Sequence, residues 1–288
     1  MKKFLAILLA VLMVATCVLA FAACDKGGND DDNNKGSNNT TANSGNSSTA
    51  TEEEGGSDAG TVPAKPVLKM ATNAYFQPYE FYKGEEIVGI DAEIAAAIAN
   101  YLGYDLVIQD MEFDTIITAV KEGSVDFGMA GMTVTPEREL EINFSNSYAT
   151  GVQSIIVPEN SPITNVDDLY ADGASYKIGV QQGPTGDIYA TDDFGADNVV
   201  AYNNGNNAVL ALVGGELDCV IIDNEPAKAL VNANSGLKIL ESSYADEDYA
   251  ICVKKENTEL LNKINEAIVA LTADGTIDAI VAKYIPAN

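Results

Sequence analysis

Strand-like and helix-like patterns alternate along residues 67–288, and the alternation starts a second time at Lys177. Such alternation indicates an α/β protein in which mainly parallel sheets are flanked by helices. Two long extended segments, residues 148–158 and residues 245–253, frame the second series. We therefore expect the chain to leave a first lobe, build a second lobe and return to the first. In open sheets of this kind ligands bind beyond the carboxyl ends of the strands, so the lobes should share a cleft.

The individual elements follow from the spacing of apolar residues and from the glycines that end several of them. Strands are expected at residues 67–71, 106–108, 127–130, 177–180, 219–223 and 249–253. Helices are expected at residues 91–102, 113–122, 208–213, 259–273 and 276–284. Asp91 is expected to cap the first helix. In helix 259–273 we expect Ile264, Ile268 and Leu271 to form the buried face.

The first 24 residues resemble an export signal, with two lysines at the start and an apolar run over residues 4–19. The run ends in Phe-Ala-Ala-Cys, which resembles the lipobox of bacterial lipoproteins with Phe21 in place of the usual leucine. We therefore expect Cys24 to be lipidated and to anchor an exported protein to the outer face of the cell membrane. The alternative is an uncleaved transmembrane anchor, although a span needs ~20 apolar residues.

Residues 25–66 consist mostly of small and polar residues, with almost no large apolar side chains. Such a segment cannot offset the entropy that ordering costs, so we expect a disordered, low-complexity tether. A random coil of roughly 40 residues has an r.m.s. reach on the order of 35 Å, which would let a folded domain move over a membrane.

Composition excludes several classes of function. The net charge of −27 argues against nucleic acid and anionic lipid surfaces as partners. The absence of histidine removes histidine-based catalytic triads and most catalytic zinc sites, and we expect no metal and no cofactor. Cys219 and Cys252 each lie in an apolar run, where we expect two buried thiols; a disulfide between them is the alternative.

Arg138 is the only arginine in a chain that contains 16 lysine and arginine residues together. It follows a turn of small residues, Ala130-Gly131-Met132-Thr133. A guanidinium offers two parallel donors to a carboxylate, which the point charge of lysine cannot reproduce. The position therefore indicates a ligand carboxylate, and the alternative is an ordinary surface ion pair.

Several segments together resemble a known family. They are Asn73-Ala74-Tyr75-Phe76-Gln77-Pro78-Tyr79-Glu80-Phe81, Val88-Gly89-Ile90-Asp91, Phe113-Asp114, Gly131-Met132-Thr133-Val134-Thr135-Pro136-Glu137-Arg138 and Phe144-Ser145-Asn146-Ser147-Tyr148. With their spacing, they resemble the solute-binding proteins of polar amino-acid ABC importers, the bacterial extracellular solute-binding proteins of family 3. The resemblance covers nearly all of residues 67–288.

The resemblance implies a two-lobe, periplasmic-binding-protein-like fold of type II with two hinge crossovers. Residues 67–150 would be the first part of lobe 1, residues 151–248 lobe 2 with the hinge segments, and residues 249–288 the second part of lobe 1. It further implies a monomeric, lipid-anchored receptor that binds a free amino acid and delivers it to the transmembrane subunits of an ABC permease.

The resemblance also assigns roles to the residues that would hold the ligand backbone. The α-carboxylate would be bound by Arg138, Thr133 and Gly131 from one lobe and by Thr185 from the other. Thr185 lies in a glycine-rich turn that opens a helix, where free N–H groups favour an anion; a plain helix cap is the alternative. Asp223, at the end of a strand, would accept the α-ammonium.

The same family pattern assigns the remaining positions. The carbonyl of Ala130 would be a second ammonium acceptor, and Phe76 and Phe113 would line the cleft. Asp223 has an alternative role as the cap of the helix that follows it, because proline at position 226 favours a first helical turn. Tyr79 and Phe81 are expected in the core.

The residues that would contact the ligand side chain depart from the pattern of many relatives. Asn73 stands where many relatives have aspartate, and Gln181 stands where some have a basic residue. This pair favours a polar, uncharged side chain such as that of glutamine. Glu80 and Glu225 would add negative charge if they faced the cleft.

Two other functions remain as alternatives. A few proteins of this fold are dehydratases, but without histidine no pair of acid and base groups here has a catalytic spacing. We therefore expect no enzymatic activity. The second alternative is a ligand sensor that signals instead of transporting.

Overall fold

The computed structural model describes residues 64–241 and 243–286, all of which belong to one compact unit, Thr61–Asn288. The predicted signal peptide, the lipidation of Cys24 and nearly all of the tether lie outside the described residues. Within the described ranges, no helix has both the length and the hydropathy to cross a membrane.

The first lobe contains the elements that precede the first crossing. They are β1 (Val67–Thr72), α1 (Ile90–Leu102), β5 (Asp105–Asp110), the short helix η1 (Phe113–Thr115), α2 (Ile116–Glu122), β6 (Phe127–Gly128) and α3 (Pro136–Glu141). A small antiparallel sheet of β2 (Tyr75–Phe76), β3 (Glu80–Lys83) and β4 (Glu86–Val88) stands between β1 and α1 in sequence.

The second lobe repeats the alternation of strand and helix. It contains η2 (Val166–Tyr170), β8 (Ile178–Gln181), α4 (Thr185–Phe194), β9 (Val199–Tyr202), α5 (Gly205–Val213), β10 (Cys219–Asp223), α6 (Asn224–Ala233) and β11 (Leu237–Ile239). The chain then returns to the first lobe and ends in α7 (Thr258–Ala273) and α8 (Thr276–Tyr284).

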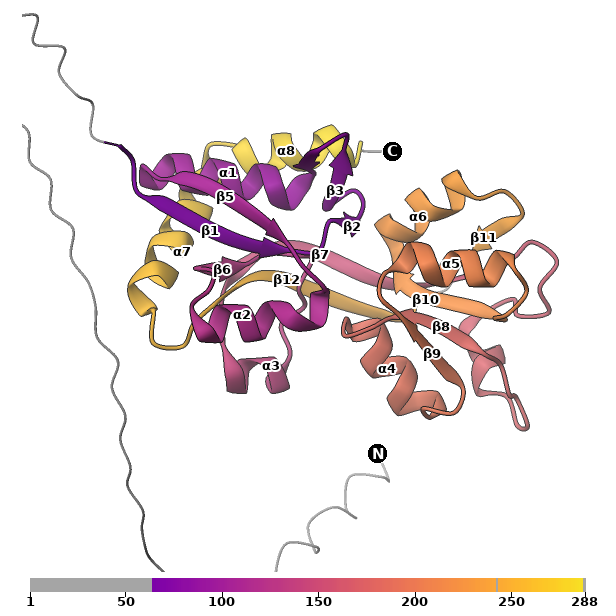
Figure 1. Cartoon of the computed structure of the whole chain (residues 1–288). Helices are drawn as coiled ribbons and strands as arrows, with labels where there is room; N and C mark the ends of the chain where they lie inside the picture. Colours follow the sequence, from indigo (N-terminus) through magenta and orange to yellow (C-terminus); the bar gives the residue numbers. More distant parts are fainter. Residues whose placement is uncertain (1–63, 242, 287–288) are drawn as a thin grey trace, which may run out of the picture. The chain divides into compact units, whose positions relative to one another are not determined.

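Two long strands, β7 (Asn143–Pro158) and β12 (Ala245–Val253), join the lobes and pair with each other in antiparallel register. They form the middle of one sheet with the order β5-β1-β6-β12-β7-β10-β8-β9, in which β11 also pairs with β7. Figure 1 shows α1, α2, α3, α7 and α8 around one end of this sheet and α4, α5 and α6 around the other. The predicted two-lobe fold is confirmed, and the predicted lobe boundaries at 150 and 248 fall within the two crossing strands.

Within each lobe the sheet is parallel, since β1 pairs with β5 and β6, and β8 pairs with β9 and β10. The crossing strands supply the antiparallel pairs. Parallel strands in a lobe place their carboxyl ends at one edge, so the loops that follow β1, β6, β8 and β10 meet between the lobes.

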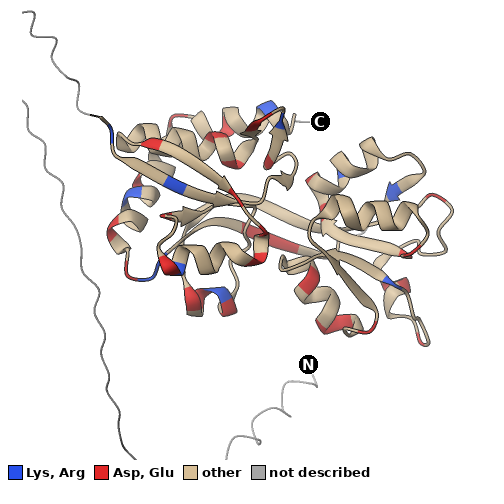
Figure 2. Ribbon diagram, viewed as in Figure 1, with Lys and Arg blue, Asp and Glu red and all other residues tan. Residues whose placement is uncertain are grey.

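The buried face of α7 carries Ile264, Ile268 and Leu271, as predicted. Cys219 and Cys252 are also buried, but they lie in separate core clusters and both are free. The predicted buried thiols are therefore confirmed, and the alternative disulfide is wrong. Figure 2 shows acidic residues distributed over both lobes with few basic ones among them, in keeping with the net charge of −27.

Candidate ligand-binding site

A small cavity of about 10 Å³ lies between the two lobes. It is lined by Asn73, Phe76, Glu80, Phe113, Ala130, Gly131, Thr133, Arg138, Gln181, Pro184, Thr185 and Asp223. All ten residues that the sequence pointed to are among them. Glu80 and Pro184 complete the lining.

Arg138 is buried against this cavity, with 7% of its surface exposed. It lies in α3, where Pro136 occupies the first turn and Thr135 caps the helix by accepting a hydrogen bond from the Arg138 amide. The guanidinium donates to the carbonyl of Thr133 at 2.7 Å and, across the cleft, to the carbonyl of Gly183 at 3.0 Å. Among the described residues no carboxylate forms an ion pair with Arg138, so the alternative of a surface ion pair is wrong.

The turn before α3 requires glycine at position 131. Gly131 has a positive φ of 53°, and a Cβ there would lie 2.8 Å from the ring of Phe76. Its N–H donates to the Asp91 carboxylate at 2.8 Å, so this amide is already bonded within the lobe. Gly131 therefore shapes the cavity wall, whereas the family pattern expects its N–H to face the ligand.

Asp91 is not the cap of α1, which corrects the prediction from sequence. The helix begins at Ile90 with Gly89 as the N-cap residue and without a side-chain cap. The carboxylate of Asp91 turns into the protein, where it accepts hydrogen bonds from Gly131 N–H and from the hydroxyl of Tyr148, both at 2.8 Å. Burial of the carboxyl raises its pKa to about 6, although both hydrogen bonds act against this shift.

The second lobe contributes Thr185 at the N-terminus of α4. Thr185 is the first helical residue after Pro184, and α4 has no side-chain cap, so the alternative of a helix cap is wrong. The Thr185 hydroxyl lies 3.3 Å from that of Thr133, which places one hydroxyl from each lobe at the same point of the cavity. The N-terminus of a helix and two hydroxyls together can bind an anion.

Asp223 faces the cavity from the end of β10. Asp223 occupies the N-cap position of α6, as the alternative expected, but its side chain makes no capping hydrogen bond. Instead it accepts hydrogen bonds from the Gln153 amide at 2.8 Å and from the Tyr249 hydroxyl. Burial and the nearby carboxylate of Glu247 raise the pKa of Asp223 to about 7.

Gln153, Glu247 and Tyr249 were not identified from the sequence. All three are buried on the crossing strands, and the Gln153 amide also donates to Glu247 at 3.0 Å. The one available signal was a polar residue at position 153 next to the apolar run of residues 155–157. That signal predicts no partner, because the partners lie 70 and 94 residues away in sequence.

Asn73 and Gln181 meet at another wall of the cavity. The Gln181 amide donates to the side-chain oxygen of Asn73 at 2.9 Å, and the Asn73 amide donates to the carbonyl of Met111 at 2.9 Å. Beside them Glu80 is fully buried; no described N–H or hydroxyl group donates to its carboxylate oxygens, and its carboxyl lies within hydrogen-bond reach of that of Asp91. Burial, together with the neighbouring carboxyl of Asp91, holds the pKa of Glu80 well above its usual range.

The aromatic residues divide between cavity and core. Phe76 and Phe113 line the cavity, and the ring of Phe113 lies 5.4 Å below the Arg138 guanidinium carbon. Tyr79 is buried outside the lining and packs against Phe76 and Tyr249. Phe81 packs against Tyr284, also away from the cavity. The expected core positions of Tyr79 and Phe81 agree with this arrangement.

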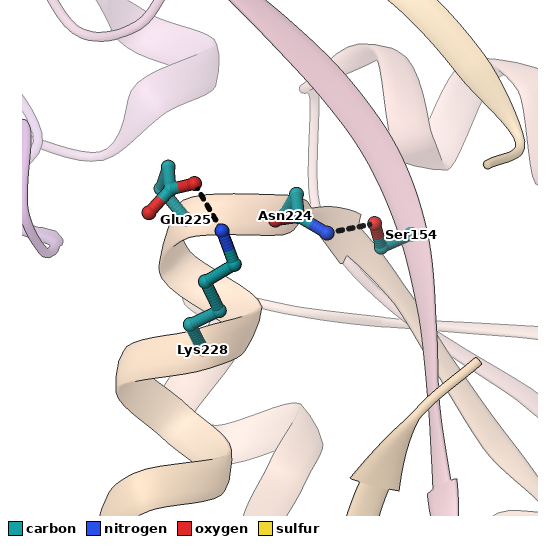
Figure 3. Close-up of polar contacts among 4 residues, drawn as sticks. All are labelled: Ser154, Asn224, Glu225 and Lys228. Atoms are coloured by element: carbon teal, nitrogen blue, oxygen red, sulfur yellow. Dashed lines mark hydrogen bonds and ion pairs between the residues drawn. The ribbon is translucent and has the colours of Figure 1, made fainter. Parts of the chain in front are cut away.

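Glu225 lies outside the cavity lining. Its carboxylate accepts from Lys228, one turn later in α6, at 2.6 Å (Figure 3). Of the two acidic residues that the sequence left open, Glu80 therefore reaches the cavity and Glu225 does not.

Comparisons with known proteins agree with this architecture. The chain is 29% identical over 231 residues to the arginine-binding extracellular protein ArtP of Bacillus subtilis (strain 168), covering 79% of this chain and 89% of ArtP. Among solved structures, an ancestral arginine-binding protein bound to glutamine is 36% identical, with a TM-score of 0.72, over 77% of this chain and 99% of that one.

A second solved structure belongs to an ancestral amino-acid-binding protein that is a precursor of cyclohexadienyl dehydratase. It is 28% identical, with a TM-score of 0.70, over 76% of this chain and 95% of that one. The profile of the bacterial extracellular solute-binding proteins, family 3, matches residues 68–287. The chain belongs to this family.

Proposed function

We propose that the protein is the extracytoplasmic binding subunit of an amino-acid ABC importer, which holds a free L-amino acid between its lobes and delivers it to the permease. The observation that supports this most strongly is the arrangement of two opposite charges around one cavity. The only arginine of the chain and the buried Asp223 both line it. These are the charges that an α-carboxylate and an α-ammonium require.

Arg138, Thr133 and Thr185 are suited to the carboxylate. A guanidinium has five N–H donors, and the two bonds to Thr133 and Gly183 leave others for a ligand. The hydroxyls of Thr133 and Thr185 come from opposite lobes and lie 3.3 Å apart, so one carboxylate oxygen beside them could accept from both. Burial strengthens such charge-assisted hydrogen bonds because the local dielectric is low.

Asp223 and the carbonyl of Ala130 are suited to the ammonium. Burial raises the pKa of the Asp223 carboxyl, and an ammonium beside it would favour the ionised form. Phe76 and Phe113 would cover the ligand with apolar surface and exclude water.

For the ligand side chain we favour a glutamine-like amide. Asn73 both donates and accepts, whereas Gln181 donates and its oxygen has no described donor; an uncharged amide in the ligand could donate to that oxygen. A second candidate is a basic side chain, as in arginine, which the burial of Glu80 without a described donor favours. A guanidinium at that position would supply donors and a counter-charge to Glu80.

The proposal extends to the cellular setting. We propose that the chain is exported, anchored to the outer face of the membrane through a lipid on Cys24, and monomeric. Cys24→Ala should leave the precursor unprocessed or release the protein from the membrane fraction. An unchanged distribution and electrophoretic mobility would show that Cys24 carries no anchor.

A thermal-shift screen of the twenty amino acids, cystine and ornithine tests the proposed function, because a ligand that binds only the folded state raises its stability. One or a few polar amino acids should raise the melting temperature, and the ligand should be recovered chemically unchanged. No stabilisation by any of them would contradict amino-acid binding. Conversion of the ligand would favour a dehydratase-like enzyme.

A further inference from the structure

The carboxylate of Asp223 is held from both strands that cross between the lobes. One oxygen accepts a hydrogen bond from the amide of Gln153 on β7 at 2.8 Å, and the other accepts from the hydroxyl of Tyr249 on β12. Gln153 and Tyr249 are fully buried. Neither of them lines the cavity; both reach it through Asp223, and the Gln153 amide also lies 3.5 Å from the hydroxyl of Thr185.

The strand pair is shaped to let Tyr249 reach across it. Glu247 of β12 is paired with Gly151 of β7, and a Cβ on Gly151 would lie 2.2 Å from the Tyr249 hydroxyl oxygen. Only glycine leaves this path open. The register of the two strands also shifts immediately after Tyr249, which marks an irregularity in the ladder at this residue.

The backbone around Asp223 is fixed to β7 as well. Asp223 is paired with Gln153 in the sheet, and the next residue, Asn224, donates to the Ser154 hydroxyl at 2.9 Å (Figure 3). Gln153 in turn donates to Glu247 on β12. The position of the carboxylate therefore depends on both strands about which the lobes would bend.

We propose that Gln153 and Tyr249 are positioning residues that hold the Asp223 carboxylate for the ligand ammonium and thereby couple ammonium binding to the geometry of the hinge. This inference rests on the proposed function. Tyr249 lies between the part of β12 that pairs with β6 of the first lobe and the part that lies beside Gln153. Its hydroxyl bond to Asp223 therefore spans the hinge, and bending of the hinge would alter it.

The two donors also favour the charged form of Asp223. Hydrogen bonds from Gln153 and Tyr249 lower the pKa of Asp223, against the opposing effects of burial and of Glu247. Asp223 also interacts electrostatically with four other titratable or charged residues, Tyr79, Glu80, Arg138 and Tyr189. Tyr249→Phe leaves all four of these residues in place.

The test compares Tyr249→Phe and Gln153→Met with the wild type, using L-glutamine and L-arginine as probes. Each variant should bind the probe that the wild type binds about tenfold more weakly, because a hydrogen bond to a charged group is lost. In an Asp223→Asn background, the same changes should add less than about twofold, since the group they position is no longer charged. Tyr170→Phe, which removes a hydroxyl bonded to Asp193 elsewhere in lobe 2, is the matched control and should bind like the wild type.

A second readout needs no ligand. The pKa of Asp223, measured by carboxyl NMR in the free protein, should be higher in Tyr249→Phe and Gln153→Met than in the wild type and unchanged in Tyr170→Phe. A residue that only supports the fold would lower the melting temperature without this shift. If Gln153→Met does not fold, Tyr249→Phe decides alone, because it keeps the aromatic ring.

The outcomes separate this inference from the proposed function. If Asp223→Asn binds the probes as the wild type does, the ammonium assignment is wrong. If Asp223→Asn loses binding while Tyr249→Phe and Gln153→Met keep wild-type affinity and an unshifted Asp223 pKa, the positioning role is overturned and the proposed function stands.

Discussion

Gln181 donates a 2.9 Å hydrogen bond to Asn73, so that two amides 108 residues apart, one from each lobe, meet at the cavity wall. Their contact closes the space into which a ligand side chain would extend. Because both amides can rotate to donate or accept, the wall adapts to an uncharged polar group more readily than to a full charge. The choice between a glutamine-like and an arginine-like ligand therefore depends on this pair and on Glu80.

Replacing Arg138 should weaken amino-acid binding. Removing one partner of a buried charge pair costs ~2–5 kcal/mol, so Arg138→Ala should lose roughly 30-fold or more in affinity. The affinity of Arg138→Lys should lie between those of the wild type and Arg138→Ala, because lysine keeps the charge without the paired donors. Calorimetric titration with the best ligand of the screen measures both. Lys121→Ala, at an exposed ion pair with Glu141, is the control. If Arg138→Ala bound the ligand with wild-type affinity, the assignment of Arg138 to the ligand carboxylate would be wrong.

Introducing a charge at Asn73 should change ligand preference. Asn73→Asp keeps an acceptor for Gln181 and adds a negative charge beside the cavity. The ratio of arginine affinity to glutamine affinity should rise by about tenfold or more, since a nearby opposite charge favours a cation. The lost bond to the Met111 carbonyl should lower the melting temperature of the free protein. An unchanged ratio would mean that position 73 does not contact the ligand side chain.

Proton release should distinguish a cationic ligand from a neutral one. Burial raises the pKa of Glu80 well above its usual range, which favours the protonated form of this carboxyl. A guanidinium beside it would favour the carboxylate, and binding of L-arginine should release about one proton more than binding of L-glutamine. Titrations in buffers of different ionisation enthalpy count these protons. The difference should vanish in Glu80→Gln; equal release in the wild type would place the ligand side chain away from Glu80.

Contacts at the cleft rim should slow ligand release. Gln182 of lobe 2 donates to Asp114 at 2.9 Å, and Asn203 donates to Glu112 at 3.3 Å, both outside the cavity lining. Exposed hydrogen bonds of this kind are weak, so the double variant Asp114→Ala, Glu112→Ala should raise the dissociation rate about three- to tenfold and change association little.

Stopped-flow tyrosine fluorescence is suited to this measurement, because the chain has 13 tyrosines and no tryptophan. Glu141→Ala, at an exposed ion pair of α3, is the control. Small-angle scattering should in addition show a more compact particle with ligand bound, as hinge closure requires. A dissociation rate equal to that of the wild type would mean that the rim does not limit opening.

The site residues that could be predicted from the sequence are those whose positions depend on motifs and local turns. The turn before Arg138, the glycine-rich start of α4 and the end of β10 are local features, and residues from each of them line the cavity. Asp91 was misassigned as a cap because its polar side chain at a helix start fits a common local pattern, whereas its partners Gly131 and Tyr148 lie 40 and 57 residues away. The bonds of Gln153 to Asp223 and Glu247 were missed for the same reason, since they depend on strand pairing across the whole chain.

The order in which the first lobe is assembled has a consequence for biosynthesis. Helix α1 packs against α7 and α8, and Ile94 and Ile98 share one core cluster with Ile264 and Ile268. This core is incomplete until the last segment of the chain has been made, so apolar surface near the N-terminus stays uncovered during synthesis. The first lobe can therefore complete its core only after α7 and α8 have been synthesised.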